Sequence, residues 1–123
     1  MNDRYYWVGL GLVKGIGTVR TKALIDHFGS AKTAWCASKQ ELIDSGLNQR
    51  IAENLNKTRS EGHLEATWER IEKGNIQVLT LEDEGYPNRL KEINNKPAVL
   101  YVLGELTPED DFAGVGLKKY LTA

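Results

Sequence analysis

Lys14-Gly15-Ile16-Gly17 separates two segments of helical periodicity and decides how the first half of the chain folds. The segment before it, residues 5–13, is apolar and predicts a short helix. In the segment after it, the apolar residues that share one helical face are Val19, Ala23, Leu24 and Phe28. Because glycine lets the backbone turn tightly between two helices, the sequence predicts a helix-hairpin-helix element.

Further helices are predicted up to residue 73. Gly29 has the position of a helix C-terminal cap, and Ser38 followed by Glu41 is a capping-box pattern that begins another helix. Over residues 47–73 the apolar positions predict either one long helix or a pair broken near Gly62. The charged residues of this segment are interpreted as its solvated face; they include Glu53, Lys57, Arg59, Glu65 and Glu69.

The pattern changes in the second part of the chain. IQVLTL (76–81) and AVLYVL (98–103) are short β-type runs, and 88–93 between them predicts a turn or two of helix. Strand, helix and strand are the beginning of a parallel βαβ unit, and no further strand is predicted after them. We therefore divide the chain into a helical domain (1–74) and the beginning of an α/β domain (75–123).

Composition excludes several classes of protein. The net charge of -1 argues against coating of nucleic acid by bulk electrostatics, although Lys14, Arg20 and Lys22 lie together without an acid among them. The single cysteine, Cys36, excludes an internal disulfide and a cysteine-based metal cluster, and we interpret it as a small buried residue. No apolar run is long enough to span a membrane, so a cytoplasmic location is predicted.

The hairpin has the residue types of a phosphate site. Its glycines bring backbone N–H groups to the surface at the positive end of the following helix dipole. The candidate DNA-binding residues are Lys14, Gly15, Ile16, Gly17, Thr18, Arg20 and Lys22. Contacts of this kind hold the sugar-phosphate backbone without reading bases, so binding would be sequence-independent and salt-sensitive. The alternative is a plain tight connector, with Ile16 buried as a plug.

No catalytic set, metal site or cofactor site is predicted. His27 and His63 have no cysteine or acidic partner at metal-ligand spacing and are interpreted as surface or half-buried residues. Asp83 and Glu84 are interpreted as solvated turn residues. The segment 114–116, Gly-Val-Gly, lacks the third glycine and the following helix of a dinucleotide fingerprint. We therefore expect no enzyme activity and no cofactor.

Two sets of residues, taken together, point to a known family. In the second half they are Leu79-Thr80-Leu81-Glu82-Asp83, Tyr86-Pro87, Leu90, Ile93, Pro97 and Leu100-Tyr101-Val102-Leu103-Gly104. In the first half they are Tyr5-Tyr6-Trp7, Gly15-Ile16-Gly17, His27-Phe28-Gly29-Ser30 and Ala34-Trp35. From residue 5 to about 112 this combination resembles the DNA-processing protein A family (DprA, also called Smf).

The resemblance implies a fold and a role. The family fold is a helical, SAM-like N-terminal domain followed by an extended Rossmann-type domain. This chain is therefore expected to be a mainly α, SAM-like helix-hairpin-helix bundle followed by the incomplete first strands of a Rossmann-like α/β domain. Members bind single-stranded DNA in natural transformation, protect it and help load the RecA recombinase, and they are not known as enzymes. Their second domain carries the strand-binding pocket, the self-association surface and the recombinase contact.

The chain departs from the family pattern near its C-terminal end. The family's next strand leads into Gly-Ser/Thr-Arg, which holds the DNA phosphate, whereas Leu117 and Lys118 here replace the hydroxyl residue and the arginine. Lysine is a point charge without the bidentate fork of arginine, so Gly116 and Lys118 are expected to be a remnant of that phosphate loop. We expect a truncated DprA-like protein with weak, sequence-independent DNA binding at the hairpin and without the RecA and self-association surfaces.

Two alternatives to this role stay open. One is a protein-interaction module, because helical domains of this type bind partners and an unfinished sheet exposes strand edges that invite pairing. The other is a remnant of a shortened or shifted reading frame that has no function of its own.

Overall fold

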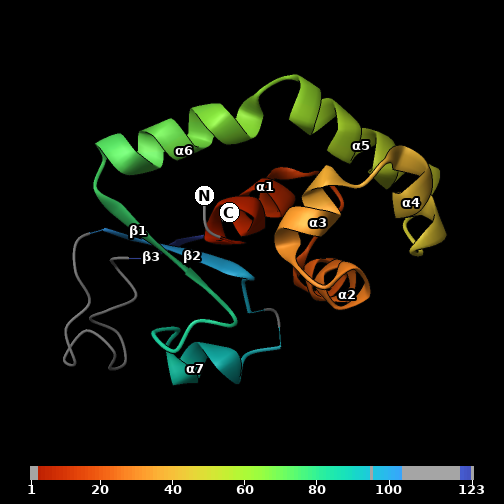
Figure 1. Cartoon of the computed structure of the whole chain (residues 1–123). Coiled ribbons are helices and arrows are strands. Elements are labelled where there is room, and N and C mark those ends of the chain that lie inside the picture. Colours follow the sequence, from red (N-terminus) through yellow and green to blue (C-terminus); the bar gives the residue numbers. More distant parts are fainter. Residues whose placement is uncertain (1–2, 95, 104–119, 123) are drawn as a thin grey trace.

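The computed structural model describes residues 3–94, 96–103 and 120–122, which form a mainly helical fold with a small sheet. The helices are α1 (Asp3–Leu12), α2 (Thr18–Phe28), α3 (Ala31–Cys36), α4 (Lys39–Asp44), α5 (Gln49–Ser60), α6 (His63–Lys73) and α7 (Asn88–Lys91). The strands are β1 (Ile76–Thr80), β2 (Val99–Leu103) and β3 (Tyr120–Thr122). Figure 1 shows α1 in the centre, with α5 and α6 along one side of it and the sheet nearby. No helix within the described ranges is long and apolar enough to cross a membrane.

Helix ends form where the sequence predicts them. Gly29 ends α2 in the left-handed conformation, with φ of 91°, and both hydrogen bonds of the capping box between Ser38 and Glu41 are present at the start of α4. Gly62, with φ of 72°, separates α5 from α6. The second of the two alternatives for residues 47–73, a broken helix pair, is therefore confirmed.

The inward face of α2 is rotated relative to the prediction. Val19 is 82% exposed and Ala23 is also exposed, whereas Thr21, Leu24 and Ile25 are buried. Both sets of residues have helical spacing, so periodicity alone does not fix which stripe faces the core. The prediction for Val19 and Ala23 is wrong because packing against α1 and α3 selects the other stripe.

The prediction of a parallel βαβ unit is wrong. β1 and β2 form where predicted but pair antiparallel, with Ile76 opposite Leu103 and Thr80 opposite Val99. The four-residue helix α7 spans only about 6 Å, whereas a five-residue strand such as β1 is about 16 Å long. α7 also buries none of its residues, so it does not form the crossover helix that packs on a sheet face in a parallel pair. A third strand, β3, was not predicted; it pairs antiparallel with β2.

One hydrophobic core runs from the helices to the sheet. Its buried residues include Trp7 and Leu10 of α1, Leu64 of α6, and Val78 and Val99 of the sheet. α1 contacts α2, α3, α5, α6, β1 and β2. The division of the chain at residue 74 stays a prediction, but the two parts share this core through α1.

Two side chains differ from their sequence interpretation at the end of α3. Cys36 is exposed rather than buried, because Ala34 and Trp35 occupy the inward positions of this short helix. Arg59, interpreted as part of a solvated face, donates from Nη1 to the carbonyl oxygens of Trp35 and Ala37, each at 2.6 Å. The last carbonyl groups of a helix have no hydrogen-bond partner inside the helix, and a cationic side chain can supply one. Arg59 therefore links α5 to the end of α3.

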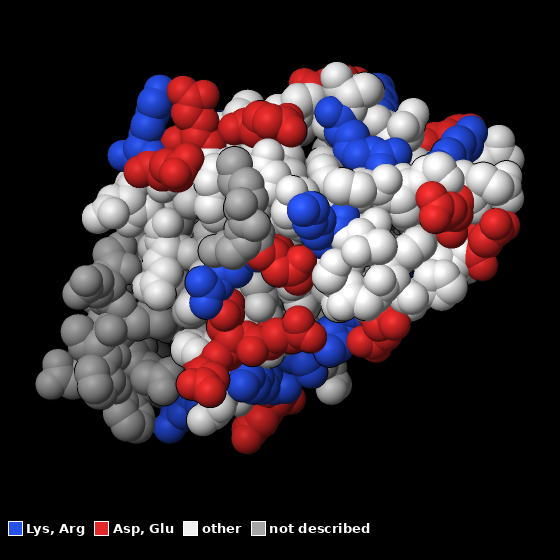
Figure 2. Space-filling model, viewed as in Figure 1, with Lys and Arg blue, Asp and Glu red and all other residues white. Residues whose placement is uncertain are grey.

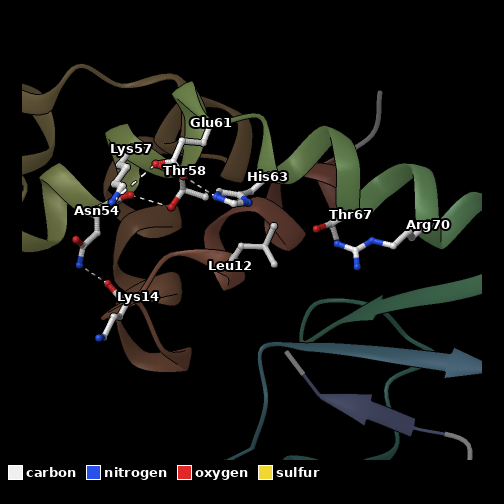
Figure 3. A pocket seen from close by; sticks show the side chains of 9 residues that line it. All are labelled: Leu12, Lys14, Asn54, Lys57, Thr58, Glu61, His63, Thr67 and Arg70. Atoms are coloured by element: carbon white, nitrogen blue, oxygen red, sulfur yellow. Dashed lines mark hydrogen bonds and ion pairs between the residues drawn. The ribbon is translucent and has the colours of Figure 1, made fainter.

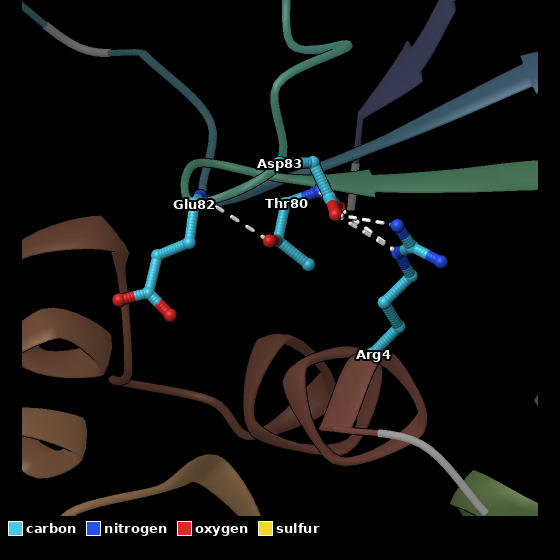
Figure 4. Close-up of polar contacts among 4 residues, drawn as sticks. All are labelled: Arg4, Thr80, Glu82 and Asp83. Atoms are coloured by element: carbon cyan, nitrogen blue, oxygen red, sulfur yellow. Dashed lines mark hydrogen bonds and ion pairs between the residues drawn. The ribbon is translucent and has the colours of Figure 1, made fainter.

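A hydrogen-bonded ion pair fastens α1 to the turn after β1 (Figure 4). Arg4 Nε donates to the Asp83 carboxylate at 3.0 and 3.1 Å, and Thr80 N–H donates to the same carboxylate at 2.7 Å. The Asp83 side chain is only 17% exposed, so its interpretation as a solvated residue is wrong. Burial raises the pKa of Asp83, but the hydrogen bonds from Arg4 and Thr80 lower it by more, so the pKa lies below its usual value.

The Asp83→Asn variant is expected to lower the free energy of unfolding by about 1–2 kcal/mol at pH 7, since a charge-assisted pair with a partly exposed arginine is lost. A depressed folded-state pKa stabilises the protein above the unfolded pKa of about 3.9 and loses this contribution as pH falls through the folded value. The two proteins should therefore converge in urea titrations below about pH 4. Glu84→Gln, at the exposed neighbouring acid, should change little at any pH. A constant difference between wild type and Asp83→Asn down to pH 2 would contradict the ion pair as its source.

Candidate nucleic-acid interface

The hairpin backbone requires glycine at one of its two glycine positions. Gly15 has φ of 98°, and a Cβ built there would lie 2.9 Å from Cγ1 of Ile51 in α5. Next to it, Asn54 Nδ2 donates to the Lys14 carbonyl oxygen at 2.9 Å. Gly17 has a negative φ, and a Cβ added to it would meet no atom within 4 Å. The hairpin is thus held close to α5 at Gly15 and open at Gly17.

Ile16 points into the protein. Its side chain is 5% exposed and belongs to the main core, and its N–H donates to the Val13 carbonyl oxygen at 3.1 Å. This is the plug that the connector interpretation describes. Burial of Ile16 does not exclude the phosphate interpretation. The buried side chain fixes the hairpin, while the residues on either side of Ile16 stay at the surface.

The beginning of α2 presents N–H groups that no side chain among the described residues caps. Gly17 is the N-cap residue and has extended backbone, and within the described part of the chain no side chain accepts a hydrogen bond at this cap. The first turn of α2 contains no acidic residue. The first N–H groups of a helix have no partner inside the helix and carry the positive end of its dipole. This end of α2 can therefore receive an anionic oxygen.

The polar side chains of the hairpin differ in how free they are. Thr18 Oγ1 donates to the Lys96 carbonyl oxygen at 2.6 Å, so this hydroxyl is already engaged. Arg20 Nη1 donates to the Gly15 carbonyl oxygen at 3.2 Å, and Lys22 Nζ lies 4.0 Å from a Glu82 carboxylate oxygen. Lys14 is exposed and, among the described residues, its ammonium group makes no hydrogen bond or ion pair. Lys14 is thus the cation most available to a ligand.

A groove at the beginning of α2 adds a cation that the sequence did not indicate. Its lining combines residues 17–20 and Lys22 with Leu81, Asn94 and Lys96. Lys96 is far from the hairpin in sequence, and no local pattern connects them. Elsewhere on the surface, Figure 2 shows acidic and basic side chains interspersed on the viewed face. Any attraction for a polyanion would therefore be local, as the net charge of -1 requires.

The remaining candidates do not add to this site. Gly116 and Lys118, the predicted remnant of a phosphate loop, lie outside the described residues. His27 is exposed and contacts the Phe28 ring edge to face, and His63 is exposed with Nε2 2.9 Å from Glu61 Oε2. Both histidines are surface residues, as their interpretation expected.

The observed fold and hairpin define a mainly helical protein with a helix-hairpin-helix element whose second helix begins with N–H groups that no side chain of the described residues caps. No family model matches the chain. It is 32% identical over 120 residues to Protein Smf of Synechocystis sp., an alignment that covers 94% of this chain and 30% of that protein. The chain is therefore a homologue of Protein Smf (DprA) and corresponds to an N-terminal portion of that protein. This confirms the resemblance seen in the sequence. It spans about 30% of the length of the relative.

Proposed function

We propose that this Smf homologue handles DNA, and that its hairpin holds the sugar-phosphate backbone weakly and without reading the base sequence. The observation that carries the proposal is the beginning of α2 beside Lys14: among the described residues no side chain caps this helix and no acid pairs with Lys14. The proposal concerns binding and not catalysis. Single-strand protection and RecA loading in natural transformation, which the family resemblance implies, are proposed for a whole protein of this family, of which the chain matches only part.

The strength of this contact is limited by the number of charges. Lys14, Arg20 and Lys96 are the basic residues near the beginning of α2 that no acid neutralises within the described ranges. Each neutralised phosphate contributes about 0.7 to the slope of log K against log salt for a single strand and about 0.9 for duplex DNA. We therefore expect the hairpin contacts to contribute about 2–3 to the slope, and binding in the micromolar range or weaker at low salt.

Gly17→Asp separates DNA binding from stability. At an extended N-cap position an aspartate caps the helix, so the free energy of unfolding should rise by about 0.5–1 kcal/mol. The same carboxylate occupies the place of a phosphate oxygen, so DNA affinity should fall about tenfold or more. Fluorescence anisotropy with a labelled 20-nucleotide strand and its duplex measures the affinity, and urea titration measures the stability.

Two variants control this experiment. Gly17→Ser caps the helix without a charge and should weaken binding less than Gly17→Asp does. Lys32→Gln, at an exposed position of α3, makes the same change in net charge away from the hairpin and should leave binding close to wild type. Equal affinities for Gly17→Asp and Lys32→Gln would reject the hairpin as the binding site.

A further inference from the structure

A second groove begins at the hairpin and follows the joint between α5 and α6 (Figure 3). Lys14 lines it at one end and Arg70 of α6 at the other, with Leu12 of α1 between them. Asn54 and Lys57 of α5 form part of the wall. Gly62 makes the bend between α5 and α6, and α6 packs on α1. The groove therefore shares Lys14 with the hairpin and leads away from it.

The charges in this groove are unbalanced. Three basic side chains, Lys14, Lys57 and Arg70, line it with a single acid, Glu61, although the whole chain has a net charge of -1. Lys57 Nζ lies 3.8 Å from Glu61 Oε1, and the Lys57 side chain is 75% exposed. Arg70, like Lys14, makes no side-chain ion pair or hydrogen bond among the described residues. Two cations at opposite ends are thus free to meet an anion.

The polar lining favours a phosphate backbone over bases. Asn54, Thr58 and Thr67 line the groove. Asn54 Nδ2 already donates to the Lys14 carbonyl oxygen at 2.9 Å and Thr58 Oγ1 to the Asn54 carbonyl oxygen at 2.8 Å. Among the described residues the Thr67 hydroxyl makes no hydrogen bond, so it can donate to a phosphate oxygen, as hydroxyl groups do in other nucleic-acid complexes. Among the described residues no Phe, Tyr or Trp side chain lines it, and its one aromatic ring is the imidazole of His63, which lies 2.9 Å from Glu61. The groove therefore has none of the large aromatic platforms on which unpaired bases stack. An extended polyanion that tracks the groove without base contacts matches this chemistry.

We propose that the α5–α6 groove continues the DNA path from the hairpin, with Lys57 and Arg70 as further phosphate contacts. This inference rests on the proposed function at the hairpin and extends it to a second surface. Lys14, at the boundary, contacts the strand in both parts. Glu61 lies beside Lys57 and His63, where it weakens the attraction of the groove for an anion.

Removal of the two groove cations tests the path. Lys57→Gln/Arg70→Gln should weaken binding of the labelled 20-nucleotide strand about tenfold at low salt and reduce the salt slope by about 1.4, the loss expected for two single-strand phosphate contacts. The matched control is Lys39→Gln/Lys73→Gln, which removes two exposed lysines of α4 and α6 that lie outside the groove. Circular dichroism confirms that each variant is folded.

The outcomes distinguish this inference from the proposed function. If the groove variant binds like its control while Gly17→Asp binds weakly, the proposal that DNA follows the groove is overturned and the hairpin site stands. If the groove variant loses affinity while Gly17→Asp does not, DNA binds in the groove without the hairpin, which overturns both the hairpin site and the continuous path. Wild-type affinity in both variants overturns the hairpin site and the groove path together.

Removal of Glu61, the acid in the groove, should strengthen DNA binding instead of weakening it. Glu61→Gln should tighten DNA binding about two- to fivefold and steepen the salt dependence, because it leaves Lys57 unpaired. Glu69→Gln is its control, since Glu69 also pairs with a lysine four residues away on the surface but lies outside the groove. Equal affinities for Glu61→Gln and Glu69→Gln would overturn the inference, and a variant with improved binding cannot be explained by loss of folding.

Discussion

Trp7→Ala is expected to lower the free energy of unfolding by about 3–5 kcal/mol, the usual cost of removing a large buried aromatic side chain. Trp7 is 2% exposed and is the largest of the fully buried side chains of α1. The loss is a large share of the roughly 5–15 kcal/mol that stabilises a typical domain. Because α1 contacts both the helices and the sheet, the cavity weakens the whole fold and not one edge of it.

Urea titration monitored by circular dichroism and by tyrosine fluorescence measures this effect. Trp68→Ala is the control, since Trp68 is only half-buried and contacts the Tyr5 ring edge to face, and it should cost about 1–2 kcal/mol. The same titration on the wild type tests the predicted division at residue 74: coincident transitions mean that the two parts unfold together. A cost below about 1 kcal/mol for Trp7→Ala would contradict the central position of α1.

Gly15→Ala is expected to lower the free energy of unfolding by about 2–4 kcal/mol. Two costs add at this position: a positive φ, unfavourable for residues with a Cβ, and overpacking of the new methyl group against a neighbour. That neighbour is Ile51, which is itself buried and lies 2.9 Å from the Cβ position. The Ile51 side chain cannot retreat without disturbing the core between α5 and the hairpin.

Gly17→Ala is the matched control for Gly15→Ala in the same motif. Its φ is negative and its Cβ would meet nothing within 4 Å, so the cost should stay below about 1 kcal/mol, mainly from a poorer N-cap residue. Urea titration of both variants gives the comparison. Equal costs at the two glycines would show that the hairpin does not depend on the left-handed residue at Gly15.

The site was only partly predictable. The sequence indicated the hairpin because Gly15, Gly17 and their neighbouring cations are adjacent in the chain. It did not indicate Lys96, and it assigned Lys57 to a solvated helix face, because a helical pattern does not reveal which element packs beside that face. The groove arises only where α5, which contacts the hairpin through Asn54, turns at Gly62 into α6, which packs on α1.

The sequence by itself determined the positions of the helix ends. The capping box of Ser38 and Glu41, the left-handed Gly29 and the break at Gly62 each depend on residues within about four positions of one another, so their energies are local. The tertiary structure alone decided which stripe of α2 is buried, that β1 and β2 run antiparallel, and that Arg4 binds Asp83, 79 residues away. These choices depend on which surfaces meet after the chain has folded, and local patterns carry no record of such contacts.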